Sequence, residues 1–205
     1  MTKKPDIHFE KEGHRYKING IDSLSVTQAI QGVGMTDFSK VRPDILEASK
    51  KFGNAVHRMT ELDDKNNLCE ESLSGPLIPL LAGWRKFKKD YGIKKFLANE
   101  EKLGSLLFMY AGTPDRVAVI KSDIAIIDLK STTTLYKTVK LQTAAYKQLW
   151  NENNPKRKAK RRLAVRLIPN NYRVNEFHDD SSDWRVFLAC LQVTNFKLEN
   201  NLIKF

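Results

Sequence analysis

The chain has 205 residues and a formal net charge of +11, with 41% hydrophobic and 29% charged side chains. This length and composition predict one folded domain with a buried core, and they exclude a wholly disordered chain. No apolar run approaches the roughly eighteen residues that span a bilayer, and the opening residues lack the apolar stretch of a signal peptide. We therefore expect a cytoplasmic protein with no membrane partner.

The N-terminal segment predicts short strands and then a helix. Residues 7–21 alternate polar and apolar side chains around two turn signals, Glu12-Gly13 and Asn19-Gly20. This pattern is typical of small antiparallel strands. The motif Ser25-Val-Thr-Gln28 forms a capping box, which predicts that a short helix begins there.

A longer helix is expected from Pro43 to about Asp64, because proline suits the first turn of a helix and apolar residues follow at helical spacing. Gly53, His57 and Glu61 lie one turn apart on one face of this helix. The remaining elements, in chain order, are a helix over residues 76–91, strands over 96–103, 106–120 and 124–130, a helix over 135–151, a hairpin over 163–177 and a helix over 183–198.

Two acidic residues are predicted to face each other on a hairpin. Apolar runs over 117–120 and 124–127 flank Lys121-Ser122, so the simplest hairpin turns at these two residues. In that register Asp115 lies opposite Asp128, with their Cβ atoms about 5 Å apart. Two carboxylates at this distance repel each other unless a cation lies between them.

An amine joins this pair of acids. The two-residue period of a strand places Lys130 on the same face as Asp128. Carboxylate oxygens are the ligands that Mg²⁺ or Mn²⁺ prefers, and such an ion assists phosphate hydrolysis. Lys130 would orient or deprotonate the attacking water, or neutralise developing charge. In the alternative interpretation, Asp128 and Lys130 only mark the point where a buried strand reaches solvent.

Positive charge is concentrated in one segment. Residues 135–173 contain eleven Lys and Arg residues and one acidic residue. This excess creates a positive potential that attracts a polyanion, so nucleic acid is the expected partner. A dense basic run, here called the 156–162 run, is a candidate phosphate-binding surface, with a solvated loop as the alternative. Its basic residues are Lys156, Arg157, Lys158, Lys160, Arg161 and Arg162.

Four motifs in order resemble the PD-(D/E)XK nuclease superfamily, and in particular its RecB-like branch of phage exonucleases and recombination or repair nucleases. They are Gly53-Asn-Ala-Val-His57, Gly112-Thr-Pro-Asp115, Asp128-Leu-Lys130 and Gln142-Thr-Ala-Ala-Tyr146. Residues 14–27 also resemble the N-termini of phage-encoded members. The resemblance implies a restriction-endonuclease-like α/β fold, with a mixed central sheet flanked by helices on both faces and an N-terminal β-hairpin.

The resemblance also implies roles for individual residues. Asp115 and Asp128 would ligate Mg²⁺ or Mn²⁺, together with His57 and the main-chain carbonyl of Leu129. Lys130 would act on the attacking water. Taken alone, a single histidine on an amphipathic helix is more often a packing residue, but Gly53 one turn earlier favours a functional role because it leaves room for a close approach.

Similar nucleases often use a further acid on the preceding strand. Glu100 and Glu101 both qualify, but adjacent strand residues point to opposite faces, so only one can serve, and we favour Glu100. Gln142 and Tyr146 are four residues apart and share a helix face, where they would hold a phosphate or a stacked base. Ordinary helix packing is the alternative for this pair.

These observations predict a single nuclease domain over 1–205, with an N-terminal hairpin element over 1–25, a helical part over 26–95 and a catalytic sheet over 96–205. We expect a metal-dependent DNA exonuclease that acts at DNA ends in recombination, repair or phage replication, with a recombination protein as a further partner. The 156–162 run is expected to flank the metal site. The alternatives are a non-catalytic nucleic-acid-binding module and a structure-specific endonuclease.

Overall fold

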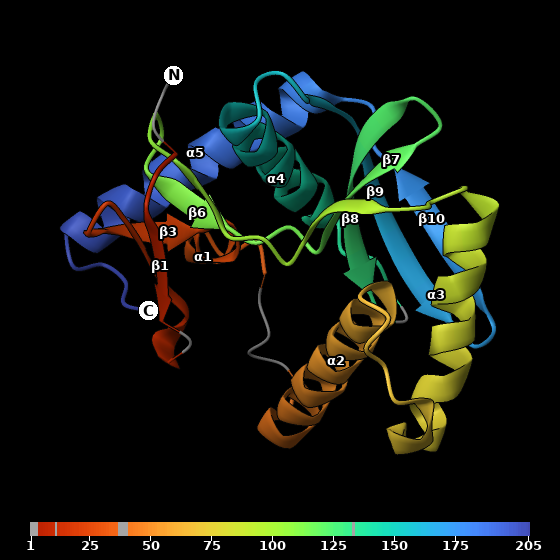
Figure 1. Ribbon diagram of the computed structural model, residues 1–205. Helices are drawn as coiled ribbons and strands as arrows, with labels where there is room; N and C mark the ends of the chain where they lie inside the picture. The colour runs from red at the N-terminus through yellow and green to blue at the C-terminus, as the bar shows by residue number, and fades with distance from the viewer. Residues whose placement is uncertain (1–3, 11, 37–40, 133) are drawn as a thin grey trace.

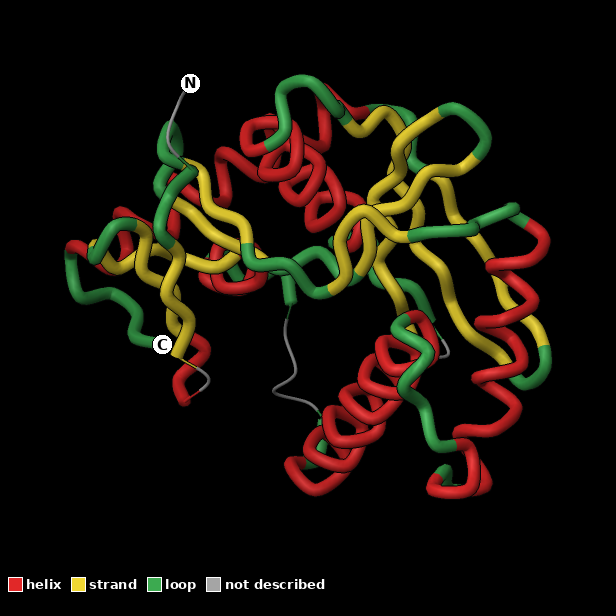
Figure 2. The backbone as a smooth tube through the Cα atoms, in the orientation of Figure 1, coloured by secondary structure: helices red, strands yellow, loops and turns green. Residues whose placement is uncertain are grey.

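The computed structural model describes residues 4–10, 12–36, 41–132 and 134–205, which form an α/β fold with two mixed sheets (Figures 1 and 2). The strands are β1 (Ile7–Glu10), β2 (Arg15–Ile18), β3 (Ile21–Ser25), β4 (Phe96–Asn99), β5 (Leu103–Ser105), β6 (Tyr110–Gly112), β7 (Arg116–Ile120), β8 (Asp123–Lys130), β9 (Ala159–Ile168) and β10 (Asn171–Glu176). The α-helices are α1 (Val26–Gly32), α2 (Pro43–Asp64), α3 (Ile78–Asp90), α4 (Val139–Asn153) and α5 (Asp180–Glu199). No helix in these ranges is both long and apolar enough to cross a bilayer.

The N-terminal strands belong to a sheet with the order β1-β2-β3-β6-β5. The expected antiparallel strands and the turn at Asn19-Gly20 are confirmed, and both turn residues have positive φ. The Ser25 capping box is present at the start of α1. Because β3 pairs in parallel with β6, the N-terminal hairpin is joined to the segment that leads into Asp115. The Tyr16 hydroxyl lies 2.9 Å from Thr113 Oγ1, which adds a hydrogen bond to this link.

The second sheet has the order β10-β9-β8-β7-β4. The hairpin of β7 and β8 has the expected register, with Arg116 opposite Ile127 and Ile120 opposite Asp123. β8 and β9 are parallel and are connected through α4, whereas the other strand pairs of this sheet are antiparallel. The predicted mixed sheet is therefore confirmed.

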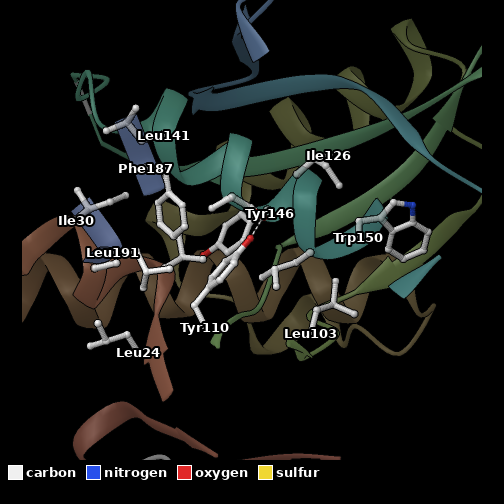
Figure 3. Packing of buried hydrophobic residues seen from close by; sticks show 14 of the residues in the cluster. Leu24, Ile30, Leu103, Tyr110, Ile126, Leu141, Tyr146, Trp150, Phe187 and Leu191 are labelled. Carbon is white, nitrogen blue, oxygen red and sulfur yellow. Dashed lines mark hydrogen bonds between the residues drawn. The ribbon is translucent and has the colours of Figure 1, made fainter. Parts of the chain in front are cut away.

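Helices cover both faces of the second sheet, as expected, because its strands are apolar on both sides. Ile127 and Leu129 of β8 point toward α2 and α3, where Trp84 is fully buried. Ile126, on the other face, packs with α4 and α5 in the cluster of Figure 3, which includes Phe187. This alternation along β8 places Asp128 and Lys130 on the α4 side of the sheet.

Several expected boundaries are wrong. The strand expected over 96–103 is interrupted at Glu100, whose positive φ of 53° breaks an extended strand, and the strand expected over 106–120 is replaced by the turn 106–109 and the separate strands β6 and β7. The helix expected from residue 135 begins at Val139. β9 begins at Ala159 rather than 163, so part of the 156–162 run lies in a strand.

Candidate metal centre

Three segments bring His57, Glu100 and Asp115 together. One ligand atom from each residue lies within 4.8 Å of the other two. His57 Nδ1 of α2 is 3.4 Å from Asp115 Oδ1 and 3.5 Å from Glu100 Oε1. The turn at Glu100 brings its main-chain N–H to the Asp115 carbonyl at 3.1 Å, so these two acids are held side by side. Glu101 instead points to Lys4, at 3.8 Å.

Asp128 lies on the neighbouring strand, outside this group of three. Continuing the β7–β8 register by one residue places it opposite Asp115. The Asp115 carboxylate accepts a 2.6 Å hydrogen bond from Leu129 N–H, which fixes its orientation toward β8. The Asp128 side chain is 1% exposed, and neither of its oxygens accepts a hydrogen bond from any described residue. Lys130 Nζ lies 2.8 Å from Oδ2 as an ion pair.

The electrostatics of the two aspartates differ. The negative charge of Asp115 raises the pKa of His57 to about 10, against the effect of burial. Burial alone would raise the pKa of Asp115, but His57 and Lys130 hold it below its ordinary value. Burial raises the pKa of Asp128, and the nearby Asp115 charge adds to this effect although Lys130 opposes it. Asp128 is therefore a desolvated carboxyl whose negative charge is only partly compensated by protein groups.

Lys130 connects this carboxylate to α4. Its Nζ lies 3.4 Å from Gln142 Oε1, and Gln142 Nε2 donates to the Tyr146 hydroxyl at 3.1 Å. Gln142 and Tyr146 thus share a helix face, as expected. The Tyr146 ring is buried in the core of Figure 3, where a Cβ at Gly112 would come within 2.7 Å of it. The expected stacking of a base on Tyr146 is wrong, because its ring has no exposed face.

A buried ion pair supports the site, and the sequence motifs did not reveal it. The Arg116 guanidinium is fully buried and donates to Asp64 at 2.6 Å and to Thr60 at 3.1 Å, both on α2. It also donates to the Asp115 carbonyl at 2.6 Å and to Glu100 at 3.3 Å. Arg116 therefore ties α2 to two of the site acids. Its signal in the sequence was an arginine inside an apolar strand, which requires a buried anionic partner.

The 156–162 run does not flank the metal centre. Ala159 pairs with Ile124 near the start of β8, whereas Lys130 pairs with Arg166. Six strand residues separate these positions on β8, which corresponds to about 20 Å. The start of the run lies at the far end of the sheet because β9 runs parallel to β8 and enters at that end, whereas Arg162 pairs with Ile126.

Lys160, Arg161 and Arg162 of the run form ion pairs within the fold. The Arg162 side chain is fully buried, donates to Asp183 at 2.9 Å and also contacts Asp180, both on α5. Its predicted role in binding nucleic acid is therefore wrong, because phosphate cannot reach it. Arg161 pairs with Glu176 at 2.7 Å. For Lys156, Arg157, Lys158, Lys160 and Arg161, nucleic-acid binding stays a prediction.

Comparisons with known proteins identify a shared fold. No protein-family model and no curated protein matches the sequence. Among solved structures, a "putative exonuclease" from Eubacterium rectale has a TM-score of 0.53 and 11% identity, covering 89% of this chain and 83% of that chain. The crystal structure of SSO0001 has a TM-score of 0.44 and 12% identity, covering 84% of this chain and 75% of that chain. At this identity the likeness to the Eubacterium rectale protein shows that the chain shares its overall fold.

Proposed function

We propose that the protein is a divalent-metal-dependent nuclease that hydrolyses phosphodiester bonds of DNA from its ends. The observation that carries this proposal is the meeting of His57, Glu100 and Asp115 within 4.8 Å, beside the buried carboxylate of Asp128 and the amine of Lys130. The PD-(D/E)XK motif order supports it, as does the shared fold with a protein named as an exonuclease.

The residues present fit a divalent cation. Among the described residues, the buried Asp128 carboxylate has the Lys130 ammonium 2.8 Å from Oδ2 and no partner at Oδ1, and a buried anion without full compensation favours cation binding. Carboxylate oxygens suit Mg²⁺ and Mn²⁺, and an imidazole can complete the set. Asp115, Asp128, His57 and Glu100 are the residues that would hold the ion, with the carbonyl of Leu129. A bound ion would polarise the scissile phosphate and lower the pKa of a water molecule.

The side chains around this site have separable tasks in the proposal. Lys130 presents an ammonium group next to Asp128, where it neutralises charge that develops on the phosphate and orients the attacking water. Gln142 holds Lys130 on its other side, at 3.4 Å. Arg116 holds Glu100 and the Asp115 main chain in place from the protein interior.

A digestion panel tests the proposal. Linear, nicked, closed circular and single-stranded DNA are incubated with wild type, with Mg²⁺ or Mn²⁺ and with a chelator. We expect products from linear DNA with metal and none with chelator. Asp128→Asn should lose more than about a hundredfold in rate, because it removes a charged ligand. Asp123→Asn is the matched control, since Asp123 lies on the same strand at the far end and pairs with Lys160.

Other results of the digestion panel would change or reject the proposal. Cleavage of closed circular DNA would replace end-dependent action by endonuclease action. Metal-independent DNA binding without any cleavage would show a binding module and reject the nuclease assignment. Equal rates for Asp128→Asn and Asp123→Asn would reject the assignment of Asp128.

A further inference from the structure

A line of apolar residues lies on the exposed side of α5. This helix packs against α1 and α4 at the edge of the fold (Figure 1). Four of its apolar residues are exposed to solvent instead, namely Val186, Ala189, Val193 and Phe196, and Phe196 is 59% exposed. They follow one another at spacings of three, four and three residues, so they form one continuous stripe along the helix. Such a stripe on an outer helix is typical of a surface that packs against another helix.

Met35 widens this stripe from the segment that follows α1. Its sulfur lies 3.8 Å from the Sγ atom of Cys190, halfway along α5, and Met35 is 49% exposed. Methionine side chains adapt their shape to a partner, so they are frequent at binding surfaces. The exposed apolar surface therefore combines Met35 with the stripe over residues 186–196 and is here called the α5 face.

The charges around the α5 face favour a protein partner over nucleic acid. The helix contains three acidic and two basic residues, whereas the whole chain has a net charge of +11. A polyanion is therefore attracted to other parts of the surface. Arg185 and Glu199 lie beside the stripe and are both exposed, and neither forms an ion pair with any residue that the structure describes.

The stripe is complementary to a second copy of itself. When two copies of α5 run antiparallel, Val186 of one copy lies against Phe196 of the other, and Ala189 lies against Val193. Each larger side chain then meets a smaller one. Because the arrangement has a two-fold axis, every contact occurs twice, and no further surface is left open for a third copy.

The flanking charges fit the same antiparallel register. Arg185, Gln192 and Glu199 are seven residues apart, so they lie in line along one flank of the stripe. In this register Arg185 of one copy lies beside Glu199 of the second copy, and the symmetry repeats the pair at the other end. Gln192 lies at the two-fold axis, where the amides of the two copies can bond to each other.

We propose that the α5 face is the interface of a two-fold symmetric dimer in which the two α5 helices pack antiparallel. The proposal uses none of the residues of the metal centre and is independent of the nuclease assignment. A stripe of this length buries less surface than a standard protein interface, so the dimer should be weak, with a Kd of about 10–100 μM.

Sedimentation of the whole protein, without DNA, from well below to well above this Kd tests the proposal. Arg185→Glu and Glu199→Arg should each weaken self-association by about tenfold, because each variant places like charges side by side at both ends of the interface. An equimolar mixture of the two variants should associate like wild type, because every pair across the interface then has opposite charges. The protein that carries both changes should also associate like wild type, for the same reason.

An apolar position provides the matched control. Val193→Glu places a charge in the middle of the stripe and should weaken the dimer by more than about a hundredfold. Ile78→Glu introduces the same charge at another exposed apolar residue, at the start of α3, and should change the Kd by less than about threefold. Circular dichroism and the thermal midpoint of each variant at low concentration show whether the monomer is folded.

Three results would overturn the proposal. Wild type that stays monomeric at the highest concentration would show that the α5 face does not bind a second copy. Equal losses in Val193→Glu and Ile78→Glu would show that the association does not depend on the α5 face. A mixture of Arg185→Glu and Glu199→Arg that associates no better than either variant alone would reject the antiparallel register.

Discussion

Asp64 and Asp128 are both buried aspartates whose side chains are 1% exposed, but their surroundings differ. Asp64 Oδ1 accepts hydrogen bonds from Trp84 Nε1 and Lys88 Nζ, each at 2.9 Å, and its Oδ2 accepts one from Arg116. Among the described residues, Asp128 has no hydrogen-bond partner at Oδ1, and at Oδ2 it has the adjacent ammonium of Lys130. A buried carboxylate whose partners are complete stabilises the fold, whereas one left incomplete is available to a ligand.

The largest effect on stability is expected at Asp64. Asp64→Asn leaves the buried Arg116 cation without its closest anion, so the free energy of unfolding should fall by about 3–5 kcal/mol. Asp128→Asn, the matched substitution, should leave the thermal midpoint unchanged or raise it, because it removes an incompletely paired buried charge. Calorimetry of both variants measures this difference. Equal destabilisation by the two would contradict the distinction between the two aspartates.

A smaller loss of stability is expected at Gly83 in α3. A Cβ at this position would overlap the carbonyl oxygen of Asn171 and lie 3.1 Å from its carbonyl carbon. These are backbone atoms at the start of β10, so Gly83→Ala should cost about 1–3 kcal/mol through overpacking. Urea unfolding measures this loss of stability. A midpoint equal to that of wild type would show that the backbone at Asn171 moves aside without a loss of stability.

Gly53, in α2, should behave in the opposite way. A Cβ at Gly53 would meet only Ser131 Oγ, at 3.8 Å, so the fold itself has room for a side chain. Gly53→Ala should therefore stabilise the protein by about 0.5–1 kcal/mol, because alanine favours a helix. If DNA approaches this face of α2, next to His57, the turnover should fall while stability rises. A variant that is more stable and equally active would exclude that approach.

The smallest effect is expected for the ion pair of Arg161 and Glu176. Hydrogen bonds from Arg161 lower the pKa of Glu176 below its ordinary value, and burial opposes this shift. The stability that the pair contributes is thus present above about pH 4.5 and is lost as the pH falls through the lower pKa of the folded state. Glu176→Gln should cost less than about 1 kcal/mol at pH 7. The free energies of unfolding of wild type and Glu176→Gln should converge at low pH. A difference that stays constant with pH would contradict the ion-pair explanation.

Structural features that depend on residues close together in the sequence were predicted correctly. The hairpin register that places Asp115 opposite Asp128 followed from two apolar runs and a two-residue turn, and the capping box at Ser25 followed from local side chains. The helix from Pro43 to Asp64 was also predicted with its bounds.

Contacts between residues that are far apart in the sequence were not predicted. The ion pairs of Arg162 arise because α5 packs against β9, so a run of basic residues gave no sign that one of them is fully buried. In the same way, the pairing of Arg116 with Asp64 joins residues that are 52 positions apart. The turn at Glu100, which brings this residue to His57, has a left-handed backbone that residue preferences do not favour.

The two acids of the β7–β8 hairpin and His57 of α2 meet across very different sequence separations. Asp115 and Asp128 approach each other through a short loop, which closes quickly during folding. His57 is 43 residues from Glu100, and its arrival depends on the docking of α2. Since non-local contacts form slowly, a refolding chain should acquire the hairpin early and bring His57 to Glu100 and Asp115 only in its last kinetic phase.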